Sequence, residues 1–161
     1  MQGLSIRTEP TPKDIEIVRN IVSSSGFFHD YEVPVAVELV QERIEKGEAS
    51  GYFFVFADLN GETISYACFG PIPCTKSSYD LYWIATRNDF RGNGVGKIVL
   101  KEAENQIKKF GGKAIYIETS SKPLYKPTQQ FYLGNGYTIE AILKDFYDSN
   151  DDKLIFTKRL D

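Results

Sequence analysis

The sequence predicts a mixed α/β fold, and three observations support this. Short apolar runs typical of strands alternate with segments whose apolar residues recur every three or four positions, as on one face of a helix. Asn60-Gly61 lies between two apolar runs and is a strong hairpin signal. A strand–helix–strand pattern from Tyr79 to Thr119 favours a parallel pair of strands joined by a right-handed crossover.

The first 50 residues are predicted to form one strand and two helices. Leu4 to Arg7 alternates between apolar and polar residues, as a short strand does. Thr11-Pro12-Lys13-Asp14 resembles a capping box, with a hydroxyl at the cap, proline next and an acid three residues after the cap. The helix that follows has an apolar face and ends near Gly26; that face contains Ile15, Val18, Ile21 and Val22. A second helix is predicted from Pro34 to Lys46, with Gly47 as its stop.

Three strands are predicted next, over Tyr52–Ala57, Thr63–Phe69 and Tyr79–Thr86. The first of them is apolar on both faces, so we expect it to be covered on both sides. A helix from Val95 to Phe110 follows and is ended by Gly111-Gly112. Its predicted buried face consists of Val95, Ile98, Val99, Ala103, Ile107 and Phe110.

The chain closes with a strand at Ala114–Ile117, a short helix after Pro127 and two strands around Asp148–Asp152. The whole pattern gives about seven strands and about four helices. Neither an internal repeat nor a long Pro/Gly/Ser-rich linker divides the chain, so a single domain over residues 1–161 is expected.

Composition excludes several classes of protein. The chain has 161 residues, 19 Lys+Arg against 22 Asp+Glu and 42% hydrophobic residues, which suits an ordinary core and argues against a dedicated nucleic-acid binder. No apolar run approaches the ~20 residues of a membrane span, and the N-terminus lacks the layout of a signal peptide, so a cytoplasmic protein without a membrane partner is expected. Cys68 and Cys74 cannot make a disulfide framework, and no cluster offers four metal ligands, so no metal is expected.

A glycine-rich segment, Arg91-Gly92-Asn93-Gly94-Val95-Gly96, joins a predicted strand to a predicted helix. Glycines at such a junction allow positive φ and close approach of a ligand, and the unpaired N–H groups of the first helical turn attract an anion. A tight turn without a ligand is the alternative. The spacing fits neither a P-loop, which needs a hydroxyl where Ile98 stands, nor a dinucleotide fingerprint, which needs a glycine at Lys97 or Val99.

The pattern Arg-x-x-Gly-x-Gly, formed by Arg91, Gly94 and Gly96, resembles the pyrophosphate loop of the GCN5-related N-acetyltransferase (GNAT) superfamily. Ile115–Glu118 and Phe131–Tyr137 resemble the family's next strand and its Tyr-x-x-x-Gly-Phe/Tyr segment. Within the superfamily, residues 83–137 look most like the bacterial ribosomal-protein N-terminal alanine acetyltransferase type.

This resemblance implies a GNAT fold with a splayed gap between the fourth and fifth strands, and acetyl-CoA as co-substrate. Backbone groups of the glycine-rich segment would hold the pyrophosphate, and those of the preceding strand would pair with pantetheine. The implied cofactor-binding residues are Ile84, Ala85, Thr86, Arg91, Gly92, Asn93, Gly94, Val95, Gly96, Lys97 and Thr128. Tyr125 stands where the family often has an asparagine, and Thr128, Lys122 or Lys126 are candidates to replace its contacts.

The resemblance also implies two catalytic residues. Glu118 aligns with the glutamate that serves as base, although an exposed strand-end carboxylate is the alternative. Tyr132 lies four residues before Gly136, in the position of the general acid, although a core aromatic is the alternative. His29, Asp30, Tyr31 and Glu32 lie in the connection that borders acceptor sites in this family, although a solvated loop explains them equally well.

The resemblance therefore implies an acetyl-CoA-dependent N-acetyltransferase in which a primary amine attacks the thioester directly. The alternatives are a catalytically silent acyl-CoA-binding module of the same fold and a generic phosphate- or nucleotide-binding domain. The acceptor and the choice between monomer and homodimer stay open.

Overall fold

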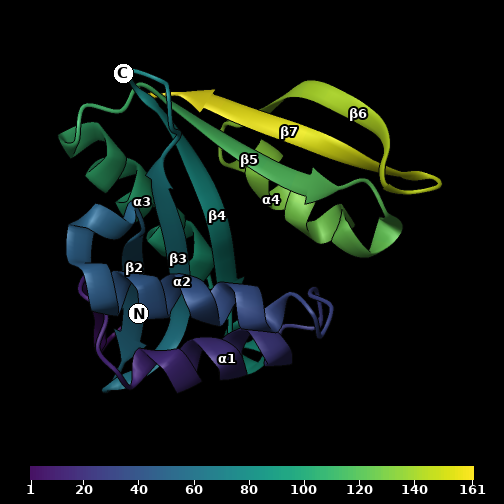
Figure 1. Cartoon of the computed structure of the whole chain (residues 1–161). Helices are drawn as coiled ribbons and strands as arrows, with labels where there is room; N and C mark the ends of the chain where they lie inside the picture. Colours follow the sequence, from purple (N-terminus) through teal and green to yellow (C-terminus); the bar gives the residue numbers. More distant parts are fainter. The chain divides into compact units, whose positions relative to one another are not determined.

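The computed structural model describes all 161 residues. Its strands are β1 (Leu4–Arg7), β2 (Phe53–Leu59), β3 (Glu62–Pro71), β4 (Ser78–Thr86), β5 (Ala114–Ser120), β6 (Thr138–Asp148) and β7 (Asp151–Arg159). Its α-helices are α1 (Asp14–Ser24), α2 (Val33–Lys46), α3 (Val95–Lys109) and α4 (Lys126–Gly134) (Figure 1). The element order confirms the predicted one, and the predicted mixed sheet of seven strands is present.

The hydrogen-bonded strand order is β1-β2-β3-β4-β5-β7-β6. The predicted parallel pair is confirmed, because Ser78–Asp80 of β4 pair in parallel with Ala114–Tyr116 of β5. The printed sequence does not reveal that the last strand, β7, lies between β5 and β6. The β4–β5 register ends at Asp80 and Tyr116, early in both strands, which agrees with the predicted splay.

Two compact units make up the chain: Met1–Gly70 with Tyr82–Gln106, and Pro71–Leu81 with Ile107–Asp161. β4 and α3 each contribute residues to both units. The prediction of a single domain over residues 1–161 stays a prediction.

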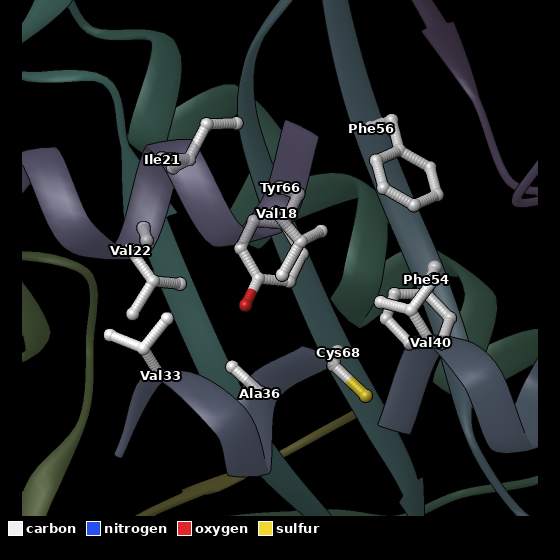
Figure 2. Packing of buried hydrophobic residues seen from close by; sticks show 11 residues of the cluster. Val18, Ile21, Val22, Val33, Ala36, Val40, Phe54, Phe56, Tyr66 and Cys68 are labelled. Atoms are coloured by element: carbon white, nitrogen blue, oxygen red, sulfur yellow. The ribbon is translucent and has the colours of Figure 1, made fainter. Parts of the chain in front are cut away.

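The first unit has its core between the helices α1 and α2 and the strands β2 and β3 (Figure 2). The α1 residues of this core lie on the apolar face that the sequence predicts, and the strand residues alternate toward the helices; the core includes Val18, Ile21, Val22, Val33, Ala36, Val40, Phe54, Phe56, Tyr66 and Cys68. The Tyr66 hydroxyl lies among these apolar side chains without a hydrogen-bond partner (Figure 2). A buried hydroxyl without a partner costs about 1–3 kcal/mol, so Tyr66 weakens a core that its ring otherwise fills.

A buried ion-pair cluster ties α1 to the first three strands. The fully buried Asp14 carboxylate accepts bonds from Arg7, at 2.8 Å from Nη1 and 2.6 Å from Nη2. The same guanidinium bonds to Asp58 Oδ2 at 2.8 Å and to Thr63 Oγ1 at 3.0 Å. Since these residues come from β1, α1, β2 and β3, one arginine links four elements.

The capping-box prediction is only half right. The Asp14 carboxylate accepts the Thr11 backbone N–H at 2.6 Å, as the acid of a capping box does. The helix nevertheless begins at Asp14, and its cap residue, Lys13, has helical backbone angles and no side-chain cap bond. The Asp14 carboxylate therefore binds mainly Arg7 and does not form a complete capping box with the start of the helix.

The hairpin prediction is confirmed. Asn60 and Gly61 have φ of 51° and 88°, the left-handed pair that a two-residue hairpin requires. They join β2 to β3, with Leu59 opposite Glu62. The eight residues from Thr63 to Gly70 in β3 are all buried, and four successive residues of β2 are as well, which confirms that this part of the sheet is covered on both sides.

The predicted buried face of α3 needs a correction. Val95, Val99, Ala103 and Ile107 are buried, but Ile98 is 40% exposed and Phe110 is 47% exposed, while Leu100 is buried instead. At ~100° per residue, Leu100 lies next to Ile107 at one edge of the stripe formed by the four buried residues. Ile98 lies well beyond the other edge, toward solvent. Phe110 follows the last helical residue, so helical spacing no longer places it.

We expect Asp14→Asn to lower the free energy of unfolding by about 3 kcal/mol, because it leaves the half-buried Arg7 without its main partner. The matched control is Glu16→Gln, which removes an exposed pair with Arg19 on the same helix and should cost less than about 0.5 kcal/mol. Urea unfolding measures both. Equal losses in the two variants would contradict the central role of the Arg7 cluster.

Candidate functional site

The glycine-rich turn opens α3 as the sequence predicts. Gly92 and Gly94 have φ of 81° and 80°, and Gly94 accepts the Ile98 N–H at 3.3 Å, which makes it the cap residue of the helix. A Cβ at Gly92 or Gly94 would meet no atom within 4 Å, so backbone conformation rather than crowding demands glycine there. The N–H groups of Val95, Gly96 and Lys97 belong to the first turn, where a helix leaves its donors without helical partners.

The predicted pantetheine-binding residues Ile84, Ala85 and Thr86 end β4 within the same unit as this turn. Ser65 of β3 anchors that end, because its hydroxyl donates to the Ala85 carbonyl at 3.1 Å and lies 2.9 Å from Thr86 Oγ1. The connection to the turn is stiffened by Arg87, which bonds to both oxygens of Asp89 at 2.7 Å. The strand end and the turn are thus held firmly.

Two aromatic contacts join the connection between α1 and α2, which contains Phe27 and Phe28 and the predicted acceptor residues, to β4 and the glycine-rich turn. The Arg91 guanidinium lies 4.1 Å from the centre of the Phe27 ring. The Phe28 ring lies 4.9 Å from that of Trp83 on β4. Within the first unit, the structure therefore brings the connection together with Arg91.

The four predicted acceptor residues divide into two kinds. The Glu32 carboxylate accepts the His29 N–H at 2.6 Å, and the Glu32 N–H donates to the His29 carbonyl at 2.9 Å, so Glu32 is used locally at the start of α2. His29 and Tyr31 stack their rings at 5.0 Å and are exposed, as is Asp30. These three side chains remain available to a ligand.

Tyr132 lies in the second unit, on α4, and is 5% exposed. Its ring packs 5.9 Å from that of Tyr137 and 5.4 Å from that of Phe156. Burial raises the pKa of the Tyr132 phenol, so it holds its proton firmly at neutral pH. Tyr132 is therefore packed as a core aromatic residue and still carries the proton that a general acid needs, so the two hypotheses for it are compatible.

Glu118 and Tyr132 lie on opposite faces of the strand pair β5–β7. Tyr132 packs on Phe156, which is opposite Ile117 in the register, and successive side chains of a strand point to opposite faces. Glu118 is consequently on the face that α4 does not cover. Its side chain is 52% exposed, and its Oε2 lies 3.0 Å from Lys153 Nζ.

Asp80 is a residue that the sequence analysis missed. It pairs with Tyr116 in the parallel register, which places it on the same face as Glu118. It is half-buried, and burial together with the charge of Glu118 raises its pKa to about 6. The available signal was a lone carboxylate inside an otherwise uncharged strand, between Tyr79 and Leu81.

The remaining predicted residues lie near the start of α4. Thr128 is half-buried in its first turn, and Tyr125 is its cap residue. The neighbouring Gln129 donates to the Ser120 carbonyl at 3.0 Å. Of the two candidate lysines, Lys126 is exposed and Lys122 lies 3.7 Å from Asp151.

No group of three or more His, Cys, Asp or Glu side chains is arranged to hold a metal ion. None of the helices has the length and hydropathy of a membrane span.

The raised pKa of Asp80 makes a prediction about stability. Its folded pKa of about 6 exceeds its ordinary value of 3.8, so its contribution to stability is present below pH 4 and is lost as the pH rises through 6. The free energy of unfolding of Asp80→Asn, relative to that of the wild type, should therefore be higher at pH 8 than at pH 4 by roughly 1–2 kcal/mol. The expected difference is small because water still reaches the carboxyl group. Urea unfolding at both pH values measures this, with Asp161→Asn at the exposed C-terminus as control. A difference between Asp80→Asn and wild type that does not change with pH would contradict it.

The comparisons with known proteins agree on one family. The profile described as Acetyltransferase (GNAT) family matches residues 16–137. The structure is similar to that of a GNAT-family protein from Desulfovibrio desulfuricans, with 41% sequence identity, a TM-score of 0.95 and coverage of 97% of this chain and 98% of that one.

Two more distant structures share the fold. The PaiA N-acetyltransferase of Thermoplasma acidophilum, solved in complex with coenzyme A, is 19% identical, with a TM-score of 0.73 and coverage of 98% and 99% of the two chains. The ribosomal-protein alanine N-acetyltransferase of Escherichia coli is 18% identical, with a TM-score of 0.76 and coverage of 97% and 93%. No curated protein sequence matched. Because the profile covers most of the chain and a close structural relative belongs to the same family, the chain belongs to the GNAT family of acetyltransferases.

Proposed function

We propose that this chain is a cytoplasmic N-acetyltransferase that moves an acetyl group from acetyl-CoA to a primary amine by direct attack. The observation that carries the proposal is the glycine turn at the start of α3, with positive φ at Gly92 and Gly94, in a chain of the GNAT family. Direct attack needs an anion site for the coenzyme, a proton acceptor for the amine and a proton donor for the leaving thiolate. The chain offers a candidate for each.

Coenzyme A would be held mainly by backbone groups. The first-turn N–H groups of Val95, Gly96 and Lys97, with Arg91 to Gly94 before them, suit the pyrophosphate because they combine unpaired donors with the positive end of the helix dipole. The backbone of Ile84 to Thr86 would bind pantetheine, and Thr128 would add a hydroxyl. The complex of PaiA N-acetyltransferase with coenzyme A supports this use of the fold.

The acceptor amine must lose a proton before it can attack. For a lysine-like amine, deprotonation at pH 7 costs roughly 4–5 kcal/mol. Glu118 is the predicted base, and Asp80 beside it, with a pKa of about 6, is better matched to neutral pH than an ordinary aspartate. We infer that this carboxylate pair receives the amine proton, with Asp80 as the acceptor and Glu118 as its charged neighbour.

The leaving thiolate would take its proton from Tyr132. In the balanced step Asp80 first passes the ammonium proton on to solvent, and the neutral amine nitrogen bonds to the acetyl carbon as the carbon–sulfur bond breaks. The nitrogen's second proton then passes to the Asp80 carboxylate, and the phenol proton passes to sulfur, so that coenzyme A leaves as the thiol. The raised pKa of Tyr132 keeps the phenol protonated until then.

The acceptor side carries acidic and aromatic groups, which suit a cationic amine. Asp30 supplies negative charge and the stacked His29 and Tyr31 supply flat surfaces. The narrower resemblance to the ribosomal-protein alanine type stays a prediction, because 18% identity to the Escherichia coli enzyme shows the shared fold alone. The acceptor class, the absence of a nucleic-acid partner and the oligomeric state likewise stay predictions.

A panel of amines, peptides and proteins tests the function. Acetyl-CoA should release free thiol in the presence of an acceptor, and mass spectrometry should find the acceptor heavier by one acetyl group. Coenzyme A binding without turnover on any acceptor would favour the silent acyl-CoA-binding module. Stronger thermal stabilisation by ATP than by coenzyme A would instead favour a nucleotide-binding domain and contradict the proposal.

Tyr132→Phe tests the proton donor. We expect kcat to fall about 100-fold or more while the dissociation constant of coenzyme A hardly changes, because only the proton for the leaving group is removed. Tyr137→Phe, which removes a phenol from the neighbouring ring of the same cluster, is the control for packing. An unaltered kcat in Tyr132→Phe, when chemistry limits the rate, would exclude Tyr132 from the mechanism.

A further inference from the structure

Lys153 of β7 holds its ammonium group between an acid and an aromatic ring. Its Nζ lies 3.0 Å from Glu118 Oε2 and 3.6 Å from the centre of the Phe146 ring, with the Tyr147 ring 5.8 Å away. Only 12% of its side chain is exposed, against 78% for Lys144 on β6. Burying an ammonium group is costly unless charge and ring contacts compensate, so this placement is specific.

Strand pairing fixes the position of Lys153. Glu118 lies opposite Ile155 in the β5–β7 register, so Lys153, two residues along β7, is its diagonal neighbour on the same face. The Phe146 ring comes from β6, which pairs with β7 on the other side. The ammonium group of this β7 residue is therefore held by contacts from the two strands that flank it, β5 and β6.

Lys153 completes a row of charges on this face of the second unit. Asp80 and Glu118 would carry two like charges when both are ionised, and Lys153 reduces that total to a single negative charge. The other titratable groups on this face are Tyr116, opposite Asp80 in the register, Tyr147, beside Lys153, and two further residues of β7: Arg159, opposite Ala114, and Asp151, which contacts Ser120. The Glu118 charge raises the pKa of Asp80, and Lys153 pairs with that charge at 3.0 Å, so removing Lys153 would leave Glu118 unpaired and strengthen its effect on Asp80.

We propose that Lys153 is a positioning residue for acetyl transfer: it fixes the Glu118 carboxylate and offsets its charge, so that Asp80 can ionise and accept the amine proton. The catalytic part of this inference rests on the proposed function. The electrostatic part is a property of the folded chain and can be measured without turnover.

The first measurement is an NMR titration of the Asp80 carboxyl in the wild type and in four variants. Lys153→Met and Lys153→Gln should each raise the pKa of Asp80 by about half a unit or more, because both remove the cation and Gln keeps a hydrogen-bond donor. Lys153→Arg, which keeps the charge, and Lys144→Met, which removes an exposed charge on β6, should leave it within a few tenths of a unit. An Asp80 pKa that is the same in the wild type and in every folded charge-removing variant overturns the proposal.

The second measurement is the pH dependence of kcat/KM. In Lys153→Gln the acidic limb should move to higher pH by the same amount, so that activity falls about twofold or more at pH 6 and recovers by pH 8.5, and Lys153→Arg should restore the limb. An equal loss at every pH with an unmoved limb would show a merely structural role and overturn the proposal. If the wild type acetylates no acceptor, the proposed function fails, while the titration still decides whether Lys153 controls Asp80.

Discussion

The parallel pairing of Ser78–Asp80 with Ala114–Tyr116 is the constraint on which the candidate site depends. Parallel strands cannot be joined by a tight turn, so the chain must cross over between them, and it does so through the glycine turn and α3. The same register sets Asp80 opposite Tyr116 and hence on the Glu118 face. The pairing of these three residues therefore explains why the glycine turn and α3 follow β4, and why two carboxyl groups lie on the same face beside β5.

The two units treat buried carboxyl groups in different ways. Asp14 is fully buried and compensated, because Arg7 forms two bonds to it and a backbone N–H adds a third. Asp80 is half-buried and faces another acid, so its pKa rises to about 6. The first arrangement stabilises the fold, whereas the second costs stability above pH 6 and lets the carboxyl group titrate near neutral pH, as the proposed proton acceptor requires.

Local signals in the sequence predicted much of the fold. Asn60-Gly61 predicted the hairpin and the glycine segment predicted the start of α3, because both depend on the backbone preferences of a few adjacent residues. Ile98 was wrongly assigned to the core because periodicity does not say where the centre of a stripe lies. Asp80 was missed because its significance comes from Glu118, which is 38 residues away in the sequence and adjacent only through the strand register.

Site prediction shows the same division. Backbone roles, such as those of Gly94 and Val95, follow from a motif, since the motif encodes a conformation. Side-chain roles depend on partners from other strands, and neither the Lys153–Glu118 pair nor the ring of Phe146 beside it is visible in the sequence. The face opposite Tyr132 could be described only once the register of β5 and β7 was known.

The position of β7 has a consequence for how the chain is made. β7 leaves the ribosome after both β5 and β6, yet it lies between them in the sheet. Until it emerges, β5 and β6 both present unpaired edges, and neither can pair with its native neighbour on that side. The second unit therefore cannot complete its sheet until β7 has emerged, and a nascent chain that still lacks β7 is the form most open to wrong strand pairing and to capture by chaperones.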